Sequence, residues 1–101
     1  MKLTEVIVKV RTAERELQDA SRKLLILETL RDVLSVPNND YLVASRNLVV
    51  ETLEGALTSD RERNVSKACI ALFDLSTIAG KLGDDNASEH YRNIARRLAC
   101  R

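Results

Sequence analysis

The chain has 101 residues, of which 45% are apolar and 31% charged, and its formal net charge at pH 7 is +1. This balance excludes a disordered chain, which would be poor in apolar residues and rich in net charge, and it provides no overall positive field to attract nucleic acid. Three glycines and one proline are too few turn-forming residues for an all-β fold. The composition therefore predicts a single domain over residues 1–101, built from a few long helices.

The sequence also argues against a membrane protein. The longest strongly apolar stretch covers residues 68–80, which is shorter than the ~20 residues needed to cross a bilayer, and Asp74 interrupts it. The first residues lack the succession of basic, apolar and small residues that marks an export signal. We therefore expect a cytoplasmic protein without membrane contact.

Residues 3–34 carry apolar side chains alternately three and four positions apart, which is the heptad pattern of a helix with one apolar seam. The pattern predicts a helix about 48 Å long. A short strand at residues 6–10, where β-branched residues crowd together, is the alternative. Arg31 interrupts the seam, which consists of Leu3, Val6, Val10, Ala13, Leu17, Ala20, Leu24, Leu27 and Leu34.

Two further helices are expected in the middle of the chain. Pro37 ends the first helix, and the polar residues that follow it can cap a second helix over residues 40–57. Ser59 with Glu62, three positions later, predicts a capping box for a third helix over residues 60–82.

The last helix is expected over residues 87–100. Gly83 is suited to the left-handed position that ends the third helix, and Asn86 with Glu89 predicts another capping box. Because short connections make neighbouring helices antiparallel, the sequence predicts an all-α, four-helix antiparallel bundle with a long N-terminal helix over residues 3–34.

The first helix is predicted to be longer than its three neighbours, which span roughly 20 to 33 Å. Part of its seam therefore extends beyond the bundle and needs a cover. Because two-fold dimers are the commonest oligomers, we predict a homodimer, although a different protein could also cover the seam. The expected contact residues of this interface are Leu3, Val6, Val10, Ala13 and Leu17.

Two charged residues occupy positions where the pattern predicts apolar ones. Arg46 falls within the apolar stripe of the second helix, and Asp74 interrupts the third, which is apolar on most of its circumference. We predict that the third helix is central in the bundle and that Arg46 and Asp74 form an internal ion pair. In the alternative, Asp74 reaches solvent and the charged end of Arg46 extends to water along its aliphatic stem.

Catalytic and metal-binding patterns are not found in the sequence. His90 is the only histidine, and without a neighbouring cluster of ligands it is expected to be structural. Two reduced thiols are predicted for Cys69 and Cys100, because Cys100 would point away from the apolar stripe of its helix. Without a nucleophile motif or a glycine-rich phosphate loop, the sequence predicts no enzyme, no cofactor and no metal site.

Positive charge gathers in the last fifteen residues, which have a net charge of +3 from four arginines and one glutamate. Arginine side chains bind phosphate oxygens well, so these residues are candidate contacts for nucleic acid or another anion. In the alternative they form a solvated face, with positive charge that stabilises a helix C-terminus. The four residues are Arg92, Arg96, Arg97 and Arg101.

Together these observations favour a non-catalytic helical module for protein-protein interaction. We expect an adaptor, chaperone or regulator that binds another protein through apolar helix faces and forms a homodimer. The alternative is a small nucleic-acid-binding regulator that dimerises through the first helix and presents the arginines of the last.

Overall fold

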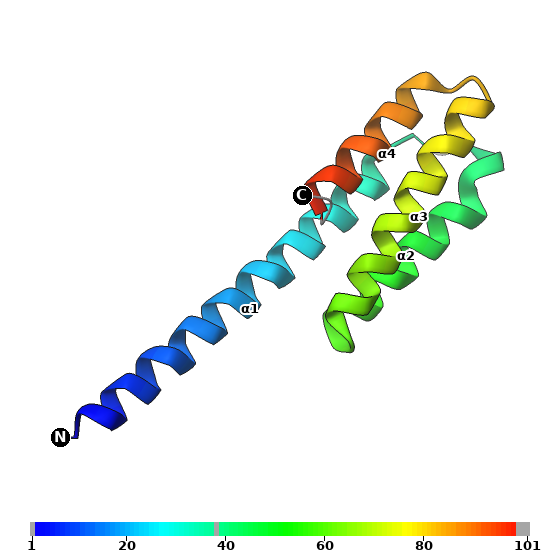
Figure 1. Ribbon diagram of the computed structural model, residues 1–101. Helices are drawn as coiled ribbons and strands as arrows, with labels where there is room; N and C mark the ends of the chain where they lie inside the picture. The colour runs from blue at the N-terminus through cyan, green and yellow to red at the C-terminus, as the bar shows by residue number, and fades with distance from the viewer. Residues whose placement is uncertain (1, 38, 99–101) are drawn as a thin grey trace.

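The computed structural model describes residues 2–37 and 39–98, which form helices and no strand. The described helices are α1 (Leu3–Ser35), a short 3-10 helix η1 (Asp40–Leu42), α2 (Val43–Thr58), α3 (Arg61–Lys81) and α4 (Asp85–Leu98). The α-helices run alternately in opposite directions, and α1 extends far beyond the others (Figure 1). The predicted all-α antiparallel bundle with a long N-terminal helix is confirmed, and the short strand at residues 6–10 is excluded.

The connection between α1 and α2 follows from its polar residues. Val36, before Pro37, is extended and ends α1. The side-chain oxygen of Asn39 accepts a hydrogen bond from the backbone N–H of Tyr41 at 3.0 Å, which starts η1. The predicted break is therefore confirmed, but Asn39 caps η1, and α2 begins at Val43 without a side-chain capping bond.

The turn between α2 and α3 differs from the prediction. Asp60 is the N-cap of α3 and adopts a left-handed conformation with a φ of 33°, without a side-chain capping bond. The predicted capping box of Ser59 and Glu62 is therefore wrong, because Ser59 lies one residue before the cap. Its backbone carbonyl instead accepts a hydrogen bond from the Asn64 side chain at 2.9 Å.

In the turn between α3 and α4, the prediction for Gly83 is confirmed, but the predicted start of the last helix is wrong. Gly83 has a φ of 84°, as expected for the left-handed position after a helix. Asp84 then caps α4, because its carboxylate accepts a hydrogen bond from the backbone N–H of Ala87 at 3.1 Å. The capping box predicted at Asn86 and Glu89 is therefore wrong, and α4 begins two residues earlier than expected.

Each α-helix of the bundle packs against two others. Helices α2 and α4 both contact α3 on one side and the second half of α1 on the other, so α1 and α3 are diagonal. The core consists mainly of aliphatic side chains, and its largest fully buried members are Tyr91, Ile26, Leu42, Leu53, Leu72, Leu75, Val33 and Val49.

Helix α3 contacts two neighbours, but it is not covered on every side. Its buried residues form a stripe that faces α2 and α4, while Ile70, Phe73 and Ile78 are exposed. Helix α3 therefore lies between α2 and α4, as predicted for a central helix, but one of its apolar sides is open rather than covered by the bundle. No helix among the described residues is long and apolar enough to cross a membrane.

Candidate interaction surfaces

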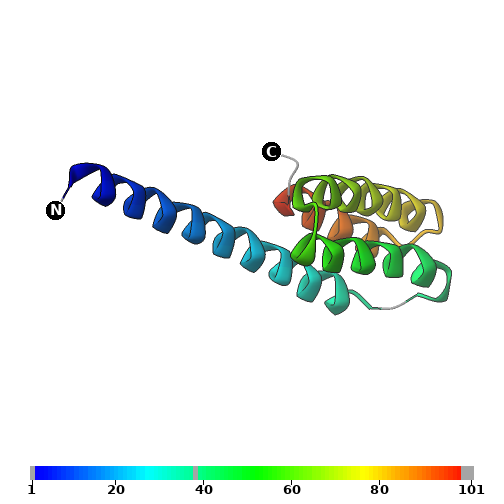
Figure 2. The same ribbon diagram turned by 90° about the horizontal axis from the view of Figure 1, so that it is seen from below.

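The first half of α1, residues 3–18, projects away from the bundle in two perpendicular views (Figures 1 and 2), and we call this segment the stem. Every residue of the stem is exposed. The molecule is correspondingly elongated, with principal extents of 64, 21 and 19 Å. The stem therefore has no packing partner within the described chain.

The five residues predicted as an interface all lie on the stem. Ala13 is exposed, and the large apolar residues among them are between 37% and 75% exposed. The structure thus places them on one uncovered apolar surface, while the identity of what covers it stays a prediction. These five are Leu3, Val6, Val10, Ala13 and Leu17.

The second half of α1, residues 19–35, which we call the base, has two different apolar faces. Ile26, Thr29 and Val33 are buried against the bundle. Leu24 and Leu27 are 56% and 51% exposed, although they lie in the same stretch of sequence as the buried Ile26. Because successive helical residues are about 100° apart, Leu24 points roughly 200° away from Ile26. The seam of the stem therefore continues along the base, on a side that the bundle does not cover.

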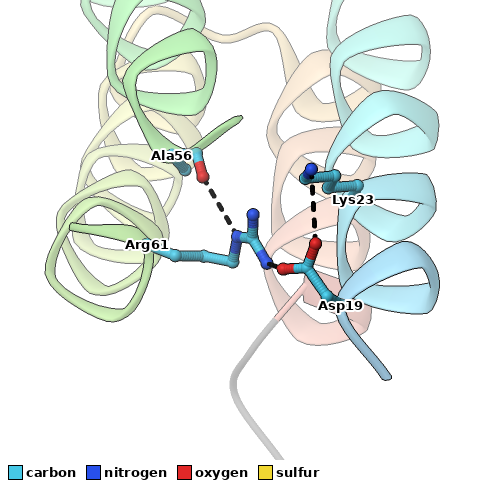
Figure 3. A network of polar contacts seen from close by, with 4 residues as sticks. All are labelled: Asp19, Lys23, Ala56 and Arg61. Atoms are coloured by element: carbon cyan, nitrogen blue, oxygen red, sulfur yellow. Dashed lines mark hydrogen bonds and ion pairs between the residues drawn. The ribbon is translucent and has the colours of Figure 1, made fainter. Parts of the chain in front are cut away.

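An ionic network links the start of the base to the first residue of α3 and to the last turn of α2 (Figure 3). The carboxylate of Asp19 accepts a hydrogen bond from the guanidinium of Arg61, and Lys23 Nζ lies 3.2 Å from it. Arg61 Nε also donates to the carbonyl oxygen of Ala56 at 3.2 Å. The hydrogen bond from Arg61, followed by that from Lys23, lowers the pKa of Asp19.

Sequence reasoning missed this network. The pairing of Asp19 with Lys23 follows the four-residue spacing of a helix and was detectable. The contact of Asp19 with Arg61 joins residues 42 positions apart, so no local pattern could indicate it. The network defines where the stem leaves the bundle.

The predicted internal ion pair of Arg46 and Asp74 is wrong. Asp74 is exposed, and among the described residues it forms no ion pair with Arg46. It lies about 200° around α3 from the buried Leu72, so it points away from the core. Burial raises the pKa of Tyr91, and the positive charge of Arg46 acts in the opposite sense.

Asp74 instead belongs to a second exposed apolar surface. It lies between Ile70 and Ile78 on α3, and Leu48 of α2 is exposed across a groove of about 270 Å³. We call these four residues the α3 outer face. Three apolar side chains around one carboxylate form a surface that could contact another protein.

The four arginines predicted as anion contacts do not form one cluster. Arg92 and Arg96 are exposed on one side of α4, in a hollow that Asp85 and Glu89 also line. Arg97 lies on another side, with Nη2 3.3 Å from the carboxylate of Asp32. Arg101 lies outside the described residues. The exposed positive charge is therefore divided, and acidic side chains lie beside it.

The remaining candidate residues show no catalytic arrangement. His90 is exposed in a hollow that Asp32 and Arg97 also line. Within residues 2–37 and 39–98, no three side chains of His, Cys, Asp and Glu gather into a group that could hold a metal ion.

Cys69 is buried and its sulfur is in a disulfide, so the prediction of two reduced thiols is wrong. That prediction depended on the direction of the Cys100 side chain, and Cys100 lies outside the described residues.

Comparison with protein-family models, with curated proteins and with solved structures finds no match to this chain.

Proposed function

We propose that this protein is a non-catalytic, homodimeric module that binds another protein through apolar helix faces, as an adaptor, chaperone or regulator does. The observation that carries this proposal is the exposed apolar seam of α1. A contiguous apolar surface of this kind is typical of an interaction site, because exposing it to water is unfavourable.

The helical state of the stem supports the same proposal. Most helical stability in proteins comes from packing of an apolar face rather than from the helix alone. The stem has no such packing in a single chain. A partner on the seam would supply it, and a second copy of the chain is the partner that we propose.

The α3 outer face is the surface that we assign to the protein partner. Its residues belong to α2 and α3, whereas the stem is the end of α1 that projects from the bundle (Figure 1), so the two surfaces are separate. Asp74 and Lys67 both line the groove of this face, so it carries one charge of each sign among apolar side chains. We therefore expect a mainly apolar partner surface with polar residues opposite these two charges.

Binding of nucleic acid has less support. Only Arg92 and Arg96 are exposed together, and Asp85 and Glu89 beside them reduce the positive potential. Loss of a salt-dependent mobility shift in an R92E/R96E variant would instead favour the nucleic-acid-binding regulator.

We also propose a cytoplasmic location. Fractionation of native host cells, followed by immunodetection of the protein, should find it in the cytoplasmic fraction. Recovery mainly from a membrane or exported fraction would contradict this location.

Affinity purification from the native host tests the proposed function. The bait is the wild-type chain, an Ile70→Glu variant of the α3 outer face, or an Asn93→Glu control on the exposed side of α4. We expect a stoichiometric protein partner with the wild type and the control, and its loss with Ile70→Glu. A partner that all three retain, or none with any bait, would contradict the assigned surface.

A further inference from the structure

We infer that the occupant of the seam is a second copy of this chain, aligned parallel and in register as a two-stranded coiled coil over residues 2–28. The inference rests on the proposed function, because it specifies the partner and the geometry for the same seam. It follows from three features of α1: the position of the seam relative to the bundle, the charges that flank it, and the residue that ends it.

The seam occupies heptad positions a and d without interruption for four heptads. Leu25 and Ile26, which face the bundle, occupy positions b and c, and the buried Thr29 occupies position f. A helix packed on positions a and d therefore lies opposite the bundle and does not collide with it. The a residues are Leu3, Val10, Leu17 and Leu24, and the d residues are Val6, Ala13, Ala20 and Leu27.

The charges that flank the seam favour a parallel pair. In a parallel coiled coil, each g residue meets the e residue five positions later on the other helix. Lys9 then meets Glu14 of the second copy, and Lys23, which also pairs with Asp19 of its own chain, meets Glu28 of the second copy. Symmetry repeats both contacts, which gives four attractive pairs. No g residue meets an e residue of like charge.

An antiparallel pair with the same overlap is unfavourable. Placing Leu3 opposite Leu27 of the second copy brings g beside g and e beside e. Lys9 then lies beside Lys23 of the second copy, and Glu14 and Glu16 each lie beside their own counterparts. All these contacts are repulsive, so the charges select the parallel arrangement.

Arg31 marks the end of the coiled coil. It occupies the a position after Leu24, where a parallel pair would bring it against its own counterpart. Its side chain is 75% exposed and lies near Asp32, with Nε 3.9 Å from the carboxylate. The two helices can therefore diverge after Leu27, with one bundle on each outer side.

Sedimentation equilibrium on charge-reversed variants of the full chain tests this inference. Lys9→Glu and Glu14→Lys each convert two attractive contacts into repulsive ones, so each variant alone should dimerise about tenfold more weakly, which is ~1.4 kcal/mol. An equimolar mixture of the two variants should recover the wild-type affinity, because both contacts are attractive again in the heterodimer. Arg11→Glu, at an outer b position, is the matched control and should change the affinity little.

Other outcomes of the sedimentation experiment distinguish the alternative arrangements. Stronger dimerisation of Lys9→Glu would indicate the antiparallel arrangement, because the new carboxylate would face Lys23. A dimer whose affinity none of the charge reversals changes, or a trimer, would overturn this inference. Neither result would contradict the proposed protein-protein interaction module. A monomeric wild type would overturn self-association itself, while the α3 outer face would still be tested separately by affinity purification.

Fluorophores attached to the N-terminus provide a second readout of orientation. Energy transfer between donor-labelled and acceptor-labelled copies should be efficient in the parallel dimer, where the two N-termini meet. Weak transfer in a sample that sedimentation shows to be dimeric would overturn the parallel arrangement.

Discussion

The stem and the base of α1 are both rich in apolar residues and belong to one continuous helix, yet their surroundings differ. In the base, Ile26 and Val33 are completely buried by the bundle. In the stem, no residue is buried. The difference comes from the position of each half relative to the bundle, because the base packs on α2 and α4, whereas the stem extends beyond them and leaves even Ile7 and Val8, which lie off the seam, exposed.

The number of apolar residues in a helix does not indicate how many partners cover it. The segment from Leu24 to Leu27 is apolar on all sides because the bundle covers one face and, in our account, a second copy covers the other. The stem lies beyond the bundle, so in this account the second copy is its only packing partner. Substitutions in the bundle should therefore change the free energy of unfolding, whereas substitutions on the seam should change dimerisation.

Leu72→Ala should have the largest effect on stability, because Leu72 is completely buried in the core. Removing such a side chain costs roughly 2 to 5 kcal/mol of the free energy of unfolding. Leu17→Ala, at an exposed position of the stem, should cost much less when unfolding is measured at a protein concentration too low for dimers. Urea denaturation of both variants checks this, and equal losses would show that the stem packs on its own bundle.

Gly83→Ala should have the next largest effect. The φ of 84° at this position is unfavourable for a residue with a Cβ, so we expect a loss of about 1 kcal/mol. Gly55→Ala is the control, since Gly55 lies in the last turn of α2 and its new Cβ would make an ordinary contact with the Asn64 side chain of α3, so the change should stabilise the helix. Thermal unfolding distinguishes the two. A neutral Gly83→Ala would contradict the left-handed turn.

Asp19→Asn should slightly lower the Tm at neutral pH, because it removes the ionic contact between α1 and Arg61. The pKa of Asp19 is lower in the folded protein, so its contribution is present above about pH 4 and is lost as the pH falls through the folded-state value. The difference in Tm between wild type and variant should therefore vanish in acid and shrink in high salt. A constant difference from neutral pH to strong acid would contradict the ionic contact.

Asp74→Ala should have the smallest effect, because Asp74 is exposed and has no ion pair with Arg46. Exposed substitutions usually change stability by less than about 0.5 kcal/mol. A larger loss of the free energy of unfolding in urea would instead support the internal ion pair with Arg46 that the sequence predicted. Partner binding, by contrast, should weaken if Asp74 is part of the α3 outer face.

The sequence was sufficient for features that depend on local periodicity. The heptad pattern predicted the length of α1 and its excess over the bundle, and Gly83 marked the end of α3. The sequence was insufficient where distant segments meet. It placed Asp74 inside the bundle because α3 is apolar on several sides, whereas one of these sides is exposed. The contact of Asp19 with Arg61 depends on how two helices pack, so neither residue revealed it.

The most direct test of the central claim is light scattering on the full chain from low to tens of micromolar, with the wild type and a Val10→Glu/Leu17→Glu variant. Both substitutions lie on the exposed seam, so the variant should keep its folded bundle. We predict a dimer for the wild type and a monomer for the variant at every concentration. A wild type that stays monomeric at tens of micromolar, or a variant that dimerises as strongly, would contradict the claim that the seam is a contact surface between two copies.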